Sequence, residues 1–229
     1  MKPALIAVAA LLLLPLAAVA EHRIPRVWAN RLALPDYIAE PNRHTPRYTD
    51  GTYLPPLIDD TRRYTAADSP LIIGGPTVIT PDASVTLAAG TLVVVDEYGT
   101  LENHGRLEIN GTSADPVVFA SNEVHPQNQT WGGLITAGNG YTYAEHLWIR
   151  DAAPSITCQP NSVVRLTNNR LEGGLIGIYQ ASQSCLITTS SIVAVRDGLV
   201  AAGVTPQISD TVIRAREHDI HRIIPSNEY

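Results

Sequence analysis

An internal repeat of 21–22 residues constrains the fold of this chain more than any other feature. When residues 164–184, 185–205 and 206 onward are aligned, their apolar residues fall into three columns. The columns are Leu166, Ile187 and Ile208; Leu171, Ile192 and Ile213; and Ile178, Leu199 and Ile220. A unit this short cannot bury its apolar side chains alone, so neighbouring units must stack on one another. The repeat therefore predicts a solenoid.

The residues between the columns indicate that each coil is built from β-strands. From Ser69 onward, apolar residues come in groups of two to five, separated by glycine, aspartate, asparagine or proline, with no helical period. Such groups are typical of short strands bounded by turns. We therefore predict an all-β domain over residues 69–229, with three strands per coil and roughly seven coils. A β-sandwich with coincidental spacing is the alternative.

One stretch carries a family resemblance. Residues 76–121 contain Gly111-Thr112 and then Asp115-Pro-Val-Val-Phe119, and Trp131-Gly-Gly-Leu-Ile follows. This stretch resembles the repeats of the pectin-lyase-like superfamily, especially those of exported bacterial proteins. The resemblance implies a right-handed parallel β-helix with a single chain winding through it. It does not define a function, because this fold hosts lyases, hydrolases, epimerases, adhesins and structural proteins.

The first twenty residues have the layout of a secretory signal peptide. Lys2 precedes an apolar run over residues 4–14, and Ala18-Val19-Ala20 supplies small residues for cleavage before Glu21. The alternative, a membrane anchor, needs a longer apolar run than this one. We expect an exported protein, periplasmic, on the cell surface or extracellular, with no membrane span after cleavage.

Residues 21–68 differ from the rest of the chain in being rich in proline, arginine and tyrosine. The prolines exclude a long helix or a central strand. We expect an extended segment that caps the solenoid, with a flexible tether as the alternative.

The charge of the chain excludes several classes of function. Lys2 is the only lysine, so the chain after residue 20 has fifteen arginines against 22 carboxylates and a formal net charge of −7. This balance argues against a nucleic-acid partner, which favours a basic surface. The lack of lysine excludes lysine-based catalysis, and we predict no cofactor.

The two cysteines, Cys158 and Cys185, are separated by 27 residues, which is one coil and about five residues more. A disulfide is expected in an oxidising compartment, whereas two buried free thiols are the alternative. A bridge requires Cys158 to lie at the turn that leads to the next coil.

The repeat places one group of polar side chains together on an outer face. It sets Trp148 over Arg170 and Arg150 over Glu172 on adjacent coils, with Arg214 two coils further along the second row. An outward tryptophan beside arginines and a carboxylate is a candidate saccharide-binding site. The alternative is a structural Arg150–Glu172 pair, with Trp148 covered by the N-terminal segment.

Other polar groups predict neither catalysis nor metal binding. The resemblance implies that lyases of this fold collect acidic residues around Ca²⁺, and no outward column here collects them. Hydrolases of the fold need two or three aspartates in acid and base roles, but Asp151, Asp197 and Asp219 do not share a row. His218 and His221 lie on a terminal coil, where solvated side chains are common, so we predict no metal site. We expect the stacked pairs Asn168-Asn169, Thr189-Ser190 and Asp210-Thr211 to satisfy backbone groups in turns.

These observations favour an exported, non-catalytic β-helix with a structural, adhesive or glycan-binding role. Its expected partner is a cell-surface or matrix polysaccharide, and its oligomeric state is left open. The alternative is a small polysaccharide lyase or epimerase that acts on a uronate-containing polymer.

Overall fold

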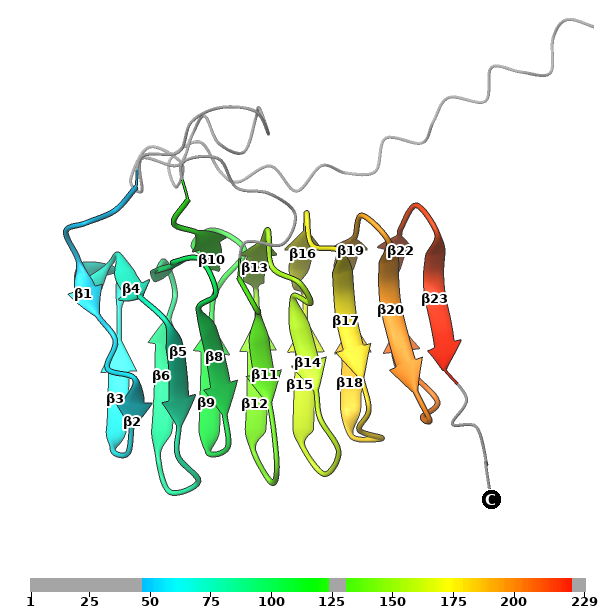
Figure 1. Cartoon of the computed structure of the whole chain (residues 1–229), viewed down its shortest axis with the longest axis horizontal. Helices are drawn as coiled ribbons and strands as arrows, with labels where there is room; N and C mark the ends of the chain where they lie inside the picture. The colour runs from blue at the N-terminus through cyan, green and yellow to red at the C-terminus, as the bar shows by residue number, and fades with distance from the viewer. Residues whose placement is uncertain (1–46, 124–130, 224–229) are drawn as a thin grey trace, which may run out of the picture.

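A computed structural model describes residues 47–123 and 131–223. The predicted signal peptide (1–20) and residues 21–46 of the N-terminal segment lie outside this range. Figure 1 shows the described strands stacked side by side along the long axis of the molecule, in chain order from β1 to β23.

The strands form three parallel sheets, which we name A, B and C. Sheet A contains β1 (Thr52–Tyr53), β4 (Leu71–Ile73), β7 (Leu92–Val95), β10 (Val117–Ser121), β13 (Leu147–Arg150), β16 (Arg170–Glu172), β19 (Ser191–Val193) and β22 (Val212–Arg214). Sheet B contains β2 (Leu57–Ile58), β5 (Pro76–Ile79), β8 (Thr100–Asn103), β11 (Leu134–Thr136), β14 (Ile156–Cys158), β17 (Ile176–Gln180), β20 (Asp197–Ala202) and β23 (His218–Ile223). Sheet C contains β3 (Thr61–Tyr64), β6 (Ser84–Ala88), β9 (Arg106–Asn110), β12 (Tyr141–Glu145), β15 (Val163–Thr167), β18 (Cys185–Thr188) and β21 (Gln207–Ser209).

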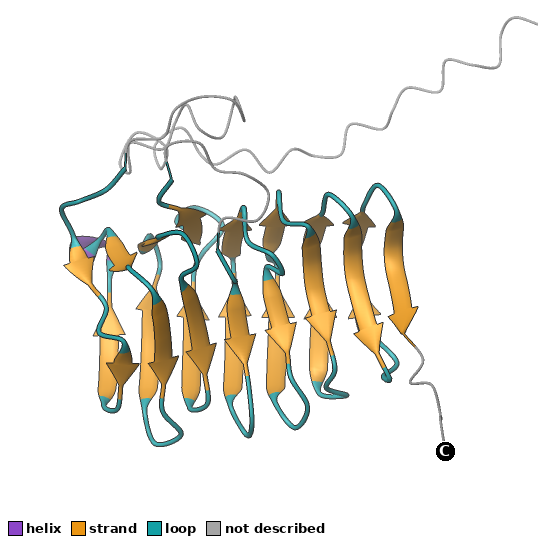
Figure 2. Cartoon of the chain, viewed as in Figure 1, coloured by secondary structure: helices purple, strands orange, loops and turns teal. Residues whose placement is uncertain are grey.

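The chain visits the three sheets in turn, and each strand pairs in parallel with the strand one coil later. The fold is therefore the all-β parallel solenoid that the repeat predicts. Figure 2 shows that strands and loops make up nearly all of it; the short 3₁₀ helix η1 (Ala66–Asp68) is the exception within the described residues. No helix in residues 47–123 and 131–223 is both long and apolar enough to cross a membrane.

The apolar columns of the repeat are confirmed by the strand register. Leu166 pairs with Ile187 and Ile187 with Ile208 in sheet C, and the predicted columns of sheets A and B pair in the same way. These side chains form one continuous core along the solenoid, except Ile220 on the last described coil, which is 43% exposed. Burial of this core is the main source of the stability of the fold.

The solenoid begins earlier than the composition indicates. Its first coil consists of β1, β2 and β3 and starts at Thr52, not at Ser69, so the molecule has about eight turns where we predicted seven. Pro55 and Pro56 lie between β1 and β2 of this coil. Proline is compatible with this position because it lies in the connection between two strands, where it interrupts neither of them.

The turns between sheets C and A explain the stacked polar pairs. In the last four of these turns, the residue that follows the sheet C strand has a left-handed backbone, namely His146 (φ 49°), Asn168 (φ 58°), Thr189 (φ 45°) and Asp210 (φ 48°). Buried Asn169 accepts a hydrogen bond from the Leu147 N–H (2.7 Å) and donates one to the Ala144 carbonyl (3.0 Å). Ser190 accepts the Asn169 N–H one coil later. The predicted structural role of these residues is confirmed.

Candidate functional site

The predicted tryptophan–arginine group lies on the outer face of sheet A. Trp148 pairs with Arg170 and Arg150 pairs with Glu172, as the repeat predicts. The Trp148 indole N–H donates to Glu172 Oε2 (3.0 Å), and the Arg170 Nε–H donates to Glu172 Oε1. The guanidinium carbons of Arg170 and Arg150 lie 4.8 and 5.4 Å from the centre of the Trp148 ring. Glu172 therefore links the tryptophan to an arginine of its own strand.

Trp148 is buried, with 3% of its surface exposed. It packs in an apolar group on the outer face of sheet A, which we name the sheet A cluster and which consists of Ile72, Leu92, Val94, Val118, Ala120 and Trp148. Tyr48 packs against this cluster, and its backbone exchanges two hydrogen bonds with the Asn122 side chain. Tyr48 of the 21–68 segment thus contacts the outer face of sheet A. A ring that is buried in this way offers little surface on which a sugar could stack.

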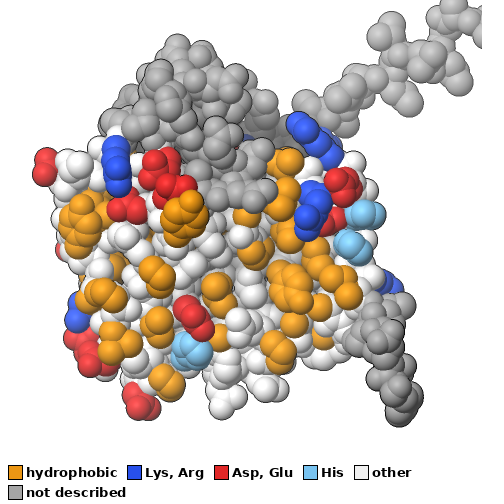
Figure 3. All heavy atoms as spheres, viewed as in Figure 1, with side chains coloured by type: hydrophobic (Ala, Val, Ile, Leu, Met, Phe, Trp, Pro, Cys, Tyr) orange, Lys and Arg blue, Asp and Glu red, His pale blue; other side chains and the backbone are white. Residues whose placement is uncertain are grey.

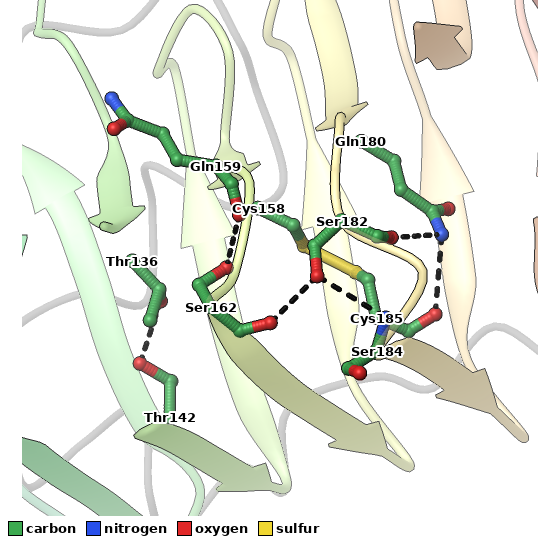
Figure 4. Close-up of a disulfide and its surroundings, with 9 residues drawn as sticks. All are labelled: Thr136, Thr142, Cys158, Gln159, Ser162, Gln180, Ser182, Ser184 and Cys185. Carbon is green, nitrogen blue, oxygen red and sulfur yellow. Dashed lines mark hydrogen bonds between the residues drawn. A yellow bond between two sulfur atoms is a disulfide. The ribbon is translucent and has the colours of Figure 1, made fainter. Parts of the chain in front are cut away.

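The cysteines form a disulfide between consecutive coils. Cys158 ends β14 and Cys185 begins β18, with their Cα atoms 6.3 Å apart. Figure 4 shows the bridge among buried polar groups, where the Ser182 hydroxyl donates to the Ser162 carbonyl (2.6 Å) and the Gln180 amide donates to the Ser182 carbonyl (3.0 Å). The bridge crosses the corner between sheets B and C, and its surroundings are inside the molecule.

A second polar group joins residues that we considered separately in the sequence. Asp197 of β20 pairs with His218 of β23, one coil later. Asp197 Oδ1 lies 2.8 Å from His218 Nδ1 and 3.5 Å from His221 Nδ1, and the Arg196 Nε–H donates to Oδ2 (2.7 Å). The ring centres of the two histidines are 4.7 Å apart. We name Asp197, His218 and His221 the Asp–His group.

The Asp–His group combines a buried carboxylate with accessible imidazoles. The Asp197 side chain is 2% exposed, whereas His218 and His221 are 51% and 42% exposed. Burial raises the pKa of the Asp197 carboxyl, but the hydrogen bonds from Arg196 and His218 and the nearby positive charges outweigh it and hold that pKa below its usual range. Figure 3 shows histidine side chains beside acidic and basic ones at the end of the molecule that carries the last coils.

The repeat contains the signal for this group. Asp197 precedes His218 by 21 residues, which is one coil, and His221 lies three residues further on. The ligand atoms of these three residues lie within 4.8 Å of one another, and they are the group of the described chain that could hold a metal ion. In the sequence, Asp197 belongs to a polar cluster with Arg196, and the two histidines belong to a separate cluster at residues 218–221. The row that combines the acid with the histidines was therefore not predicted.

A third polar region lies on the outer face of sheet C. Tyr141 and Tyr143 of β12 are both partly exposed, and the Arg106 guanidinium lies 4.9 Å from the centre of the Tyr141 ring. Tyr143 pairs with Glu108 on one side and with Arg165 on the other. We name this region the tyrosine face.

The tyrosine face also carries acidic groups. The Tyr143 hydroxyl donates to Glu145 Oε2 (2.9 Å), and this bond, together with burial, raises the pKa of the Tyr143 phenol. Arg106 forms an ion pair with Glu108. The alternation Tyr-x-Tyr in a strand is the sequence signal for two rings on one face, and we did not use it.

Comparison with known proteins agrees with this architecture. Residues 57–153 match the family model described as a pectate-lyase-like beta helix domain. No curated protein and no solved structure matches the chain significantly. Beyond residue 153, strands β14 to β23 continue the same three sheets in parallel. The family match over residues 57–153 and the parallel solenoid together support a pectin-lyase-like parallel β-helix repeat protein.

Proposed function

We propose that this chain is an exported, non-catalytic β-helix protein that binds a cell-surface or matrix polysaccharide through the tyrosine face. The observation that carries the proposal is the pair of partly exposed rings, Tyr141 and Tyr143, with arginine and glutamate side chains around them. Trp148, the ring that the sequence favours, is buried in the sheet A cluster.

The chemistry of the tyrosine face suits a sugar. Tyrosine offers an apolar ring for the carbon–hydrogen face of a pyranose, and its hydroxyl can form hydrogen bonds. Arginine and carboxylate groups form strong, directional hydrogen bonds with sugar hydroxyls. Tyr141 and Tyr143 lie on one strand of a parallel sheet, so their neighbours above and below are spaced by about 4.8 Å. Such a surface can contact several consecutive sugar units.

The charge of the chain narrows the class of polysaccharide. Arg106 and Arg165 on the tyrosine face are balanced by Glu108 and Glu145, and the chain after residue 20 has a net charge of −7. A densely anionic polymer would be repelled by the molecule as a whole. We therefore expect neutral polysaccharides to bind better than polyuronates.

A glycan array probed with the protein that begins at Glu21 tests this proposal. We expect binding to at least one neutral polysaccharide, and Tyr141→Ala and Tyr143→Ala should each reduce it at least tenfold. Tyr179→Ala is the matched control, because Tyr179 is also partly exposed but lies in sheet B. Failure to bind any glycan, or equal loss with the control, would contradict the proposal.

Export is a separate part of the proposal and rests on residues 1–20. The protein recovered from the periplasm or medium should begin at Glu21 by N-terminal sequencing. A protein that stays in the cytoplasm with Met1 or Lys2 at its N-terminus would refute export without touching the glycan proposal.

The Asp–His group favours one second candidate, a small lyase or epimerase that acts on a uronate polymer. An exposed imidazole held by a buried carboxylate can accept a proton, and the adjacent Arg196 can neutralise the uronate carboxylate. A lyase would release unsaturated uronate, seen by its ultraviolet absorbance, and His218→Ala would abolish that release. Turnover of this kind would replace the non-catalytic proposal.

A further inference from the structure

We propose that the Asp–His group binds a divalent first-row transition metal ion, with Zn²⁺ as the reference ion. The ligand atoms would be Asp197 Oδ1, His218 Nδ1 and His221 Nδ1. This site goes beyond glycan binding at the tyrosine face, which lies on sheet C and uses none of these residues.

The spacing of the ligand atoms fits a metal ion. Zinc binds histidine nitrogen and carboxylate oxygen at about 2.0–2.2 Å, so two neighbouring ligands of one ion lie about 2.8–3.6 Å apart in octahedral or tetrahedral geometry. The two nitrogens lie 2.8 and 3.5 Å from Asp197 Oδ1. Small side-chain rotations at the exposed histidines would bring the three atoms to bonding distance of one ion.

Both histidine Nδ1 atoms face the same carboxylate oxygen, so a proton or a metal ion must lie along each contact. A carboxylate oxygen and a neutral imidazole nitrogen repel each other at hydrogen-bond distance unless a proton or a metal ion lies between them. Here one oxygen, Asp197 Oδ1, faces two such nitrogens. A proton on each histidine Nδ1 is the competing arrangement, since one carboxylate oxygen can accept two hydrogen bonds. A metal ion would replace both protons and bond to all three atoms.

The Asp197 carboxylate is already held in an orientation that suits a metal ligand. Arg196 donates to Oδ2 of Asp197, which orients the carboxylate and leaves Oδ1 facing the histidines. Partners of this kind position the ligands in known metal sites. Because His218 and His221 are about half exposed, water can complete the coordination, as it does in sites with three protein ligands.

The Asp–His group lies at one end of sheet B, where a bound ion would affect the stability of the last coil. His218 and His221 lie on β23, which is the last strand in the order of sheet B, and Asp197 lies on the preceding strand β20. A bound ion would tie the terminal strand to the coil before it. We therefore expect the ion to stabilise the folded protein, since a ligand that binds only the native state raises its stability.

Calorimetric titration with ZnCl₂ tests the site. The protein that begins at Glu21 is first treated with a chelator and dialysed, and we expect one equivalent to bind. His218→Ala, His221→Ala and Asp197→Asn should each weaken binding by more than about 100-fold, beyond the loss typical of outer-sphere substitutions. His104→Ala is the matched control, because the His104 imidazole also contacts a carboxylate, Glu102 (2.8 Å), but is not part of the Asp–His group.

Two further measurements separate the site from indirect effects. Zn²⁺ should raise the melting temperature of the unsubstituted protein and of His104→Ala, but not of the two histidine variants, whose exposed positions should leave folding intact. The visible spectrum of bound Co²⁺ should report nitrogen and oxygen ligands and vanish in those variants. The proposal is overturned if Zn²⁺ does not bind, or if it binds equally well to His218→Ala and His221→Ala.

Discussion

The outer faces of sheets A and C differ sharply, although the inner faces of both sheets carry the same kind of apolar column. On sheet A, the outward side chains of β4, β7, β10 and β13 form the buried sheet A cluster. On sheet C, the outward side chains of β9, β12 and β15 are mostly charged, polar or tyrosine, with Val163 as the aliphatic exception, and all are at least partly exposed. The inward columns specify the solenoid, whereas the outward rows specify what each face contacts.

The outer face of sheet A also changes along the solenoid. Leu92, Val118 and Trp148 occupy one outward row and are buried, but the next positions of that row are Arg170, Ser191 and Val212, which is 46% exposed. The change occurs where Glu172 joins Trp148 to Arg170. The apolar part of the face thus ends at the hydrogen bonds that Glu172 accepts from Trp148 and Arg170, which we name the polar link.

The largest difference between the faces should appear when Trp148 is replaced. Trp148→Ala removes a buried ring from the sheet A cluster, and large-to-small changes of this kind cost about 3–5 kcal/mol of unfolding free energy. Urea denaturation of the protein that begins at Glu21 measures this loss. A cost below about 1 kcal/mol would mean that the ring does not contribute to packing, and the saccharide-platform hypothesis for Trp148 would regain support.

A smaller effect is expected for the polar link. Glu172→Gln keeps an acceptor for the Trp148 indole but removes the charge opposite Arg170, which should cost about 1 kcal/mol. Glu108→Gln is the matched control, because the Arg106–Glu108 pair on sheet C is more exposed, with Arg106 55% exposed against 28% for Arg170. The same urea experiment should find a loss below about 0.5 kcal/mol there. Equal losses would contradict the distinction between the faces.

The smallest effect on stability is expected on the tyrosine face. Tyr141→Ala removes a partly exposed ring and its contact with Arg106, which should cost less than about 1 kcal/mol. This change should nevertheless abolish most glycan binding. A large loss of stability with unchanged binding would show that Tyr141 is a structural residue, and the comparison of the two faces would fail.

Much of the fold follows from local sequence pattern. The spacing of Leu166, Ile187 and Ile208 defines the register of sheet C, because only stacking at that period buries all three side chains. Asn168 and Asn169 predict a turn, because asparagine tolerates a left-handed backbone and its side chain can form hydrogen bonds with backbone groups. The first coil was not predicted because prolines usually interrupt strands, whereas Pro55 and Pro56 lie between two strands.

The candidate sites depend on contacts between distant parts of the chain. The repeat correctly placed Trp148 over Arg170, but whether that outward ring is open or covered depends on what else lies on sheet A, including Tyr48, which is 100 residues earlier in the chain. The spacing of the cysteines left a disulfide and free thiols equally open, since a separation of 27 residues does not by itself align two Cβ atoms. In the structure, Cys158 and Cys185 meet across one corner.

The sequence by itself determined that this chain is a parallel solenoid with three strands per coil, because period and polarity dictate which side chains must be buried. Only the tertiary structure decided which outward rows are covered and that the two cysteines form a disulfide. It also decided that the Asp197 carboxylate lies beside two histidine side chains. The physical reason is that burial of a column is a local requirement repeated in every coil, whereas an outer face acquires its neighbours from anywhere in the chain. Function in such a fold therefore depends on the outward rows.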